Sequence, residues 1–138
     1  MAIDSIRVSL TDQPIPKVDP FGDERLGADL RFLGVVRGVE SGQQISGIRY
    51  SAYPEMAERT LRKIVDEFQN AVGPHPVVIV HRLGFVAAGE ASIVIALGQP
   101  HSAEAFDLLA SYLRRIKEDV PIWKHPVFAD GTTTATDL

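Results

Sequence analysis

Two lysines near the end of the chain are the residues whose placement most strongly suggests chemistry. Lys117 and Lys124 flank a short segment that joins an amphipathic helical pattern to an extended one. On one continuous helix, lysines seven residues apart would lie about 10 Å apart, but Pro121 lacks a backbone N–H and disfavours a helical Val120. The chain must therefore turn. Such a turn can bring both lysines towards one pocket, with Trp123 as an apolar wall.

These residues also have a purely structural explanation. A lysine in the last turn of a helix complements the helix dipole, and a lone tryptophan usually belongs to the core. Residue types alone favour this explanation, so a functional interpretation depends on the rest of the sequence.

Several further polar or cationic groups stand at the ends of predicted elements: Arg37, His81, Arg82, His101, Ser102 and His125. A helix N-terminus presents free N–H groups, so His101 and Ser102 could help to hold a phosphate. Arg37 would be a natural bidentate partner for that phosphate. Arg82 could support the same anion site, or it could form a structural pair with His81 at the end of a strand.

Composition excludes several classes of function. The 138 residues, 45% hydrophobic and 23% charged, suit one globular domain over residues 1–138. A net charge of −4 argues against broad nucleic-acid binding. The absence of cysteine excludes disulfides, thiolate nucleophiles and cysteine-ligated metals. The histidines form no HxH, HxxxH or HExxH pair, so we predict no metal site and no cofactor.

Other motif classes are also missing from the sequence. It contains no GxSxG elbow, GxGxxG loop or P-loop, which leaves triad hydrolases and nucleotide-binding folds without support. No apolar run approaches the roughly 18 residues of a membrane span, and the first residues lack a signal-peptide pattern. We therefore expect a cytoplasmic protein without a membrane segment.

Hydrophobic periodicity predicts the elements that must position these groups. It indicates strands at residues 5–10, 29–37, 45–52, 77–80, 92–97 and 122–128, and helices at 54–72 and from about residue 102. Residues 29–37 and 45–52 are expected to pair as a hairpin, and Gly34 to mark a bulge or a close backbone approach. The two continuously apolar strands, 77–80 and 92–97, suit central positions covered on both faces.

The expected helix faces follow the same periodicity. The first helix should face the core through Ala57, Leu61, Ile64, Phe68 and Val72, and the second through Phe106, Leu109, Leu113 and Ile116. Residues 12–28 hold many prolines and glycines, with a short helical turn possible at 21–26, and the threonine-rich tail is expected to fray. The fold class predicted is a single α+β domain, two amphipathic helices on a mostly antiparallel sheet.

The sequence also resembles a known family. The segments that carry the resemblance are Phe32–Arg37, Tyr50–Ala57, His81–Gly84, Gly89-Glu90, His101 with Ala105-Phe106, and Lys117–Lys124. Their order and spacing, over residues 28–131, are similar to those of the catalytic (large) subunit of molybdopterin synthase, the MoaE family.

The resemblance implies an α/β hammerhead-type enzyme of molybdenum cofactor biosynthesis. Such subunits convert cyclic pyranopterin monophosphate, a phosphorylated pterin, into molybdopterin by installing a dithiolene. Their sulfur arrives as a thiocarboxylate on the C-terminal Gly-Gly of a small ubiquitin-like carrier. A homodimer of large subunits within a heterotetramer is the implied assembly.

The resemblance also assigns candidate site residues. Lys117 and Lys124 match the family's catalytic lysines. Matching substrate-binding positions are Val35, Val36, Arg37, His101, Ser102, Lys117, Lys124, His125 and Pro126, with Arg82 and Trp123 as possible supporting residues. A phosphorylated pterin needs cations for its phosphate, an apolar wall for its ring and acid–base groups near the reacting carbons, and these residues supply all three.

Two positions depart from the family pattern. Ser102 stands where the family usually has arginine, which removes one expected phosphate contact, and Gly38-Val39 stands where a polar run is common. The departures leave open a non-catalytic paralogue that binds the sulfur carrier or an anionic metabolite. A structural assembly subunit is a third class, but it would leave the clustered cations without a role.

Overall fold

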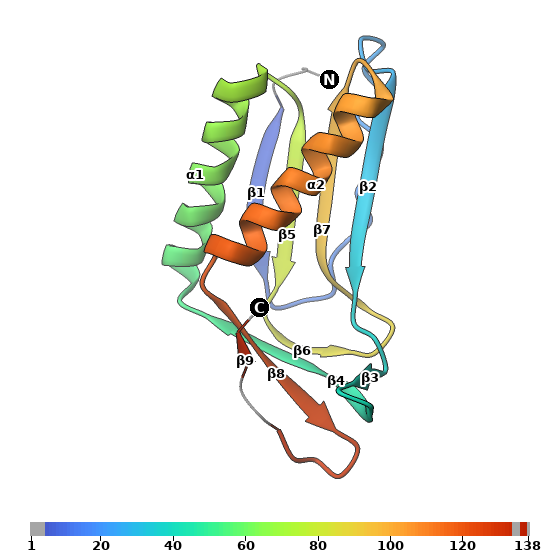
Figure 1. Ribbon diagram of the computed structural model, residues 1–138, viewed down its shortest axis with the longest axis vertical. Helices are drawn as coiled ribbons and strands as arrows, with labels where there is room; N and C mark the ends of the chain where they lie inside the picture. Colours follow the sequence, from blue (N-terminus) through green and yellow to red (C-terminus); the bar gives the residue numbers. More distant parts are fainter. Residues whose placement is uncertain (1–4, 134–135, 138) are drawn as a thin grey trace.

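The computed structural model describes residues 5–133 and 136–137 and contains two helices packed on one face of a four-stranded sheet (Figure 1). The strands of this sheet follow the order β1 (Ile6–Thr11), β5 (Val77–Arg82), β7 (Ala91–Gln99) and β2 (Ala28–Val35). Only the pair of β1 and β5 is parallel among these neighbours. The helices are α1 (Pro54–Val72) and α2 (Ser102–Asp119). This arrangement confirms the predicted fold class.

A second, smaller sheet lies beyond one end of the first (Figure 1). It is built on β4 (Gln43–Ala52), which pairs with β3 (Val39–Glu40), β6 (Gly84–Ala87) and β8 (Ile122–Phe128), while β9 (Thr136–Asp137) pairs with β8. The predicted hairpin of 29–37 with 45–52 is therefore wrong. Strand β2 pairs with β7, and the chain then leaves the first sheet and enters the second through β3 and β4. Part of the tail expected to fray lies outside the described residues.

The two central strands are buried on both faces, as predicted. Every residue from Val77 to His81 and from Ser92 to Gly98 is buried. The helices cover one face, and the irregular segment 12–27 covers part of the other, where Phe21 packs with Val78, Val80 and Ala96. No helical turn forms at 21–26. Instead, the amide of Leu26 donates to the carbonyl of Asp23 at 3.1 Å in a simple turn.

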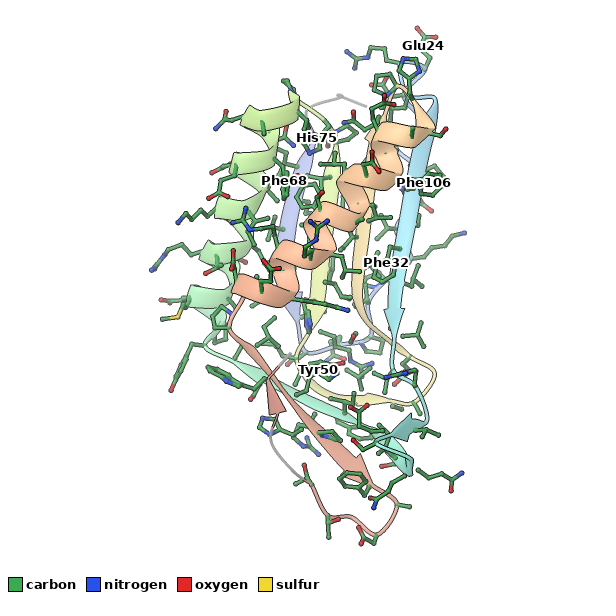
Figure 2. The ribbon with its side chains drawn as sticks, viewed as in Figure 1. Glu24, Phe32, Tyr50, Phe68, His75 and Phe106 are labelled. Atoms are coloured by element: carbon green, nitrogen blue, oxygen red, sulfur yellow. The ribbon has the colours of Figure 1, made fainter. Side chains whose placement is uncertain are left out.

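The first helix presents most of its predicted face to the core. Ala57, Leu61 and Ile64 are buried, and Phe68 lies between the helices with its ring 4.6 Å from that of Tyr112 (Figure 2). Val72 was wrongly placed in the core, because it lies at the end of the helix and is 53% exposed.

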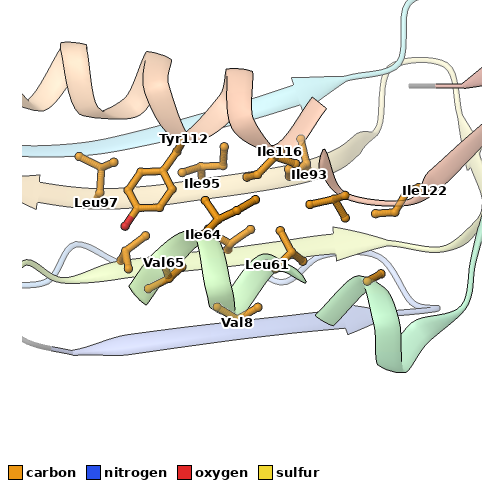
Figure 3. Packing of buried hydrophobic residues seen from close by; sticks show 14 of the residues in the cluster. Val8, Leu61, Ile64, Val65, Ile93, Ile95, Leu97, Tyr112, Ile116 and Ile122 are labelled. Carbon is orange, nitrogen blue, oxygen red and sulfur yellow. The ribbon is translucent and has the colours of Figure 1, made fainter. Parts of the chain in front are cut away.

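The predicted face of the second helix needs a correction. Ile116 is buried as predicted, and Leu109 and Leu113 are partly buried against the core, but Phe106 is 60% exposed. The fully buried row is Ala105, Leu108, Tyr112 and Ile116. Both rows have helical spacing, but the observed one places small Ala105 close to the sheet and gives Tyr112 a polar partner inside the core. Figure 3 shows Tyr112 and Ile116 facing the core residues of the sheet and of α1.

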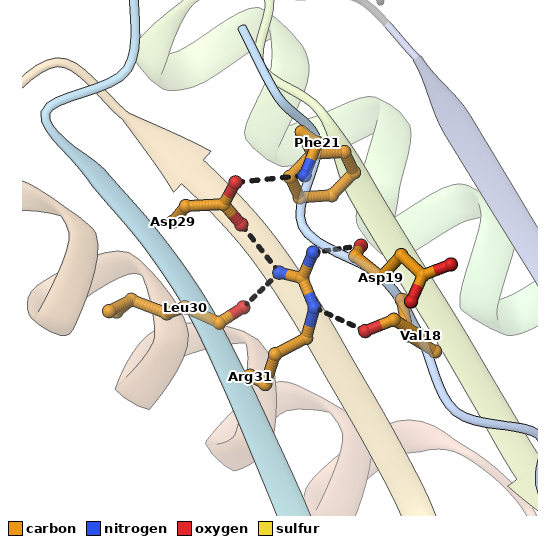
Figure 4. Close-up of polar contacts among 6 residues, drawn as sticks. All are labelled: Val18, Asp19, Phe21, Asp29, Leu30 and Arg31. Atoms are coloured by element: carbon orange, nitrogen blue, oxygen red, sulfur yellow. Dashed lines mark hydrogen bonds and ion pairs between the residues drawn. The ribbon is translucent and has the colours of Figure 1, made fainter.

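A hydrogen-bond network fastens the irregular segment to the first sheet (Figure 4). Arg31 on β2 donates to the carbonyls of Val18 and Asp19 and pairs with Asp29 at 2.6 Å. Asp29 in turn accepts the amide of Phe21 at 2.8 Å. Because one guanidinium satisfies several backbone groups, this segment is held in place without regular structure.

Neither helix in the described part of the chain has the length and apolar character that crossing a bilayer requires.

Candidate functional site

A cavity of about 300 Å³ lies where the C-terminal end of α2 meets both sheets. Tyr50 marks its position in Figure 2, in the region between the four-stranded sheet and strands β4 and β8. The lining residues come from β2, β4, β5, β7, β8, α2 and the segment that follows β2: Phe32, Gly34, Val35, Arg37, Tyr50, His81, Ser92, Ile93, Leu113, Ile116, Lys117 and Lys124.

The predicted turn at Pro121 brings the two lysines to this cavity. Helix α2 ends at Asp119, and Val120 adopts an extended conformation with ψ 124°. The amide of Val120 donates to the carbonyl of Ile116 at 3.1 Å, and β8 then begins at Ile122. Lys117 therefore reaches the cavity from the last turn of α2, and Lys124 reaches it from β8.

The third cation of the cavity, Arg37, follows an irregularity in β2. The strand register shifts between Gly34 and Val35, which confirms the bulge predicted at Gly34. A Cβ atom on Gly34 would lie 2.6 Å from Cγ2 of Ile93, so the side chain of Ile93 occupies the space that a larger residue at this position would need. Just beyond the bulge, the amide of Val36 donates to the carbonyl of Glu90 at 3.0 Å and fixes the backbone before Arg37.

Lys117 and Arg37 are available to an anionic ligand. Both side chains are exposed, and neither forms an ion pair within the described part of the chain. With Lys124 they place three cations around one small cavity. That arrangement suits a ligand with more than one negative charge.

Neutral polar groups form another part of the lining, and the predicted site residues did not include them. Tyr50 is the cross-strand partner of Lys124 and is buried, which raises the pKa of its hydroxyl, while a hydrogen bond between Tyr50 and Ser92 partly offsets the shift. The ring of His81 lies 5.2 Å from that of Tyr50 in an edge-to-face arrangement. Burial lowers the pKa of His81 to about 4. The sequence indicated His81 only as a residue at the end of a predicted strand. It indicated Tyr50 only as part of a segment that resembles the family.

Two predicted residues of β8 lie on the other side of that strand. Successive strand residues point to opposite faces, so Trp123 and His125 face away from the side that carries Lys124. Trp123 packs edge-to-face on Tyr53, 6.1 Å away, and Nε2 of His125 lies 2.9 Å from the hydroxyl of Ser51. Trp123 is therefore not a wall of the cavity, contrary to the expectation.

Three further predicted residues stand close to the cavity but outside its lining. Val36 and Pro126 are buried, and Pro126 is paired with Ile48 in the small sheet. Arg82 lies 3.3 Å from a carboxylate oxygen of Glu90, which also accepts the amide of Ala87 at 3.1 Å. The sequence left open whether Arg82 binds an anion or has a structural role at the end of a strand. Its contact with Glu90 favours the structural role.

His101 and Ser102 are not near the cavity of their own chain. They stand at the N-terminal end of α2, whereas Lys117 stands in its last turn. A helix of 18 residues is about 27 Å long. Both residues are exposed, so they could contact a ligand only at another place or in a second molecule.

A larger hollow of about 770 Å³ lies between β1 and residues 16–21. It holds Arg7, Lys17 and Asp19, but none of the predicted site residues. Within residues 5–133, no group of three His, Asp or Glu side chains is placed to hold a metal ion.

Comparisons with known proteins agree with each other. The model of the MoaE protein family matches residues 10–119. The molybdopterin synthase catalytic subunit of Halalkalibacterium halodurans is 35% identical over 130 residues, which cover 92% of this chain and 83% of that protein. The molybdopterin synthase catalytic subunit 1 of Mycobacterium tuberculosis is 35% identical over 133 residues, covering 93% and 89%.

Solved structures show the same fold. The crystal structure of molybdopterin synthase from Staphylococcus aureus superposes with a TM-score of 0.81 at 29% identity, covering 100% of this chain and 99% of that one. A structure from Helicobacter pylori, titled as a complex of subunits 1 and 2 of molybdopterin-converting factor, has a TM-score of 0.65 at 18% identity and covers 93% and 87%.

Proposed function

The chain belongs to the MoaE protein family, and we propose that it acts as the catalytic subunit of a molybdopterin synthase. In this proposal it transfers sulfur from the thiocarboxylated C-terminus of a small ubiquitin-like carrier to cyclic pyranopterin monophosphate. The product is the dithiolene of molybdopterin. The observation that carries the proposal is the cavity at the C-terminal end of α2, where Arg37, Lys117 and Lys124 come together.

The charges of the proposed reactants explain why the site needs several cations. Both the phosphate of the pterin and the thiocarboxylate of the carrier are anionic, and bringing them together in one cavity costs energy unless cations lie between them. Arg37 can bind phosphate with two parallel hydrogen bonds. Lys117 would anchor the thiocarboxylate and the pterin, and Lys124 would assist sulfur addition or loss of water.

The positions of His101 and Ser102 support a site shared by two copies of the chain. They cannot reach the cavity of their own chain, since the length of α2 separates them from Lys117. In a symmetric dimer, the N-terminal end of α2 of one copy could approach the cavity of the other. We propose a homodimer with this geometry, to which two carriers bind as a heterotetramer. The neighbouring fold from Helicobacter pylori was solved as a complex of two different subunits.

Because of Ser102 and Gly38-Val39, this chain offers fewer groups that can bind phosphate than the usual family pattern does. Ser102 can donate one hydrogen bond where arginine would offer several. Gly38 and Val39 are exposed, and Gly38 accepts the amide of Ile45 at 3.0 Å in the start of the small sheet. Arg37 would therefore carry a larger share of the phosphate interaction.

A cytoplasmic location is part of the proposal, and fractionation of the native host would check it.

A reconstituted reaction tests the proposed function. The chain is mixed with thiocarboxylated carrier and cyclic pyranopterin monophosphate, and molybdopterin is measured by its fluorescent oxidation product. The proposal predicts product that requires all three components. Carrier binding without product would instead identify a non-catalytic binding paralogue.

A further inference from the structure

His81 lies at the C-terminal end of β5, where that strand reaches the cavity. It is only 3% exposed, yet it lines the same cavity as Lys117 and Lys124. Its ring lies in an edge-to-face arrangement with that of Tyr50, which is the cross-strand partner of Lys124. A histidine of this kind is either a packed core residue or a group that faces the ligand.

The hydrogen bonds of the ring determine which nitrogen carries the proton. Nδ1 of His81 lies 2.8 Å from the carbonyl oxygen of Arg82. A carbonyl oxygen can only accept, so Nδ1 must donate its hydrogen. In the neutral ring, Nε2 is then left with a lone pair. Within the described residues, Nε2 has no hydrogen-bond partner.

The surroundings keep this ring neutral. Burial lowers the pKa of His81 to about 4, and the titratable groups that share the cavity are Arg37, Tyr50, Lys117 and Lys124. A positive charge on the ring would add to three cations in the same small space. Nε2 therefore stays an acceptor through the neutral pH range.

Most of the other polar side chains of the cavity are cations. Lysine and arginine only donate. The hydroxyl of Ser92 donates to the carbonyl of Gly34 at 3.2 Å and also interacts with Tyr50. The hydroxyls of Ser92 and Tyr50 are thus already engaged with each other, whereas within the described residues the lone pair on Nε2 of His81 has no partner in the protein. A pterin ring carries N–H donors that need such a partner.

We propose that Nε2 of His81 accepts a hydrogen bond from an N–H group of the pterin and thereby orients the ring in the cavity. This inference rests on the proposed function. It divides the site into two parts, with the cations binding the phosphate and thiocarboxylate, and His81 binding the heterocycle. No proton is transferred in this step, so His81 acts in substrate binding and orientation.

Two substitutions separate the structural hydrogen bond from the one to the ligand. In His81→Asn, the amide can replace the Nδ1 donor to Arg82, but it is too short to replace Nε2. In His81→Gln, the longer side chain places an amide oxygen near the position of Nε2. Direct binding of cyclic pyranopterin monophosphate is measured by titration calorimetry, with inorganic pyrophosphate as a second probe for the cations.

The expected result is that His81→Asn weakens pterin binding about 3- to 10-fold, while binding of pyrophosphate is unchanged. His81→Gln should recover most of the loss. Equal pterin binding by wild type and folded His81→Asn would overturn the inference, and so would an equal loss for both probes. If the wild type bound no pterin at all, the proposed function would fail as well.

A measurement on the wild-type protein does not depend on the stability of the variants. Nitrogen-15 resonances of the histidine rings are recorded before and after addition of the pterin. The Nε2 resonance of His81 should move towards the values of a hydrogen-bonded acceptor. Nε2 of His75 is the internal control, because it already lies 2.7 Å from the hydroxyl of Tyr112, away from the cavity lining. A stationary His81 resonance at saturating pterin contradicts the inference.

Discussion

At the scale of single residues, the cavity combines groups that differ in charge and in burial. Arg37 and Lys117 are exposed cations, whereas Tyr50 and His81 are buried and neutral. Exposed cations attract and position anions, while buried neutral groups offer hydrogen bonds of fixed direction. The sequence made the cations easy to select because they interrupt apolar patterns. It gave no comparable reason to select Tyr50, because this residue fits the alternation of apolar and polar residues along its strand.

The two buried histidines make the stability of the fold depend on pH. His75 is 1% exposed, with Nδ1 2.8 Å from the carbonyl of Gly73 and Nε2 2.7 Å from the hydroxyl of Tyr112. Burial lowers the pKa of His75 and of His81 below the ordinary value of 6.5. Below pH 6.5 the unfolded chain therefore binds more protons than the folded chain.

We predict that the free energy of unfolding is greatest above pH 6.5 and falls as the pH decreases from there towards about 4, the pKa of His81. His75→Gln should remove up to about 1.4 kcal/mol per pH unit from the slope over this range. Urea denaturation at several pH values measures the free energy of unfolding and hence this slope. His101→Gln is the matched control, because it makes the same substitution at an exposed histidine. An unchanged slope in His75→Gln would show that this ring titrates alike in both states.

At the scale of elements, the sequence predicted the position of most strands and helices but not all their partners. The two helices, the central strands, the bulge at Gly34 and the turn at Pro121 follow from local signals. The hairpin was wrong because the partner of β2 is β7, more than fifty residues away, and a short connection does not reveal such a pairing. Likewise, Trp123 was misplaced since alternation along β8 turns it away from the side of Lys124.

The bulge at Gly34 gives a prediction that belongs to this scale. Gly34→Ala should place a methyl group against Cγ2 of Ile93, 2.6 Å away, and Ile93 also lines the cavity. Because both backbones are held in the sheet, we expect a loss of about 1–3 kcal/mol in the free energy of unfolding and a narrower cavity. Gly38→Ala is the control, since nothing lies within 4 Å of a Cβ at that position. Equal stability of the two variants in urea would contradict the close approach.

At the scale of the whole molecule, the separation of His101 from Lys117 requires explanation. Helix α2 carries one candidate group at each end, and a folded chain cannot bring those ends together. A site made by two copies would use both ends at once. Sequence alone could not indicate this, because spacing along the chain says nothing about which molecule completes a site.

A complementation experiment tests the shared site. Arg37→Ala and His101→Ala are expected to be nearly inactive when each is produced alone. When they are coexpressed, each mixed dimer would contain one site with both changes and one with neither. Random pairing should therefore restore about one quarter of the wild-type activity. If the mixture is no more active than the separate variants, the two residues do not meet across a dimer.

The central claim is that the cavity at the end of α2 carries out sulfur transfer, and one measurement tests it most directly. Initial rates of molybdopterin formation are compared for wild type, Lys117→Ala, Lys124→Ala and Lys63→Ala. Lys63 is exposed on α1 and does not line the cavity, so its variant controls for the loss of a surface charge. We predict that the two cavity variants lose at least about 100-fold in rate while they remain folded, and that Lys63→Ala keeps the wild-type rate. Wild-type rates in both Lys117→Ala and Lys124→Ala would contradict the account.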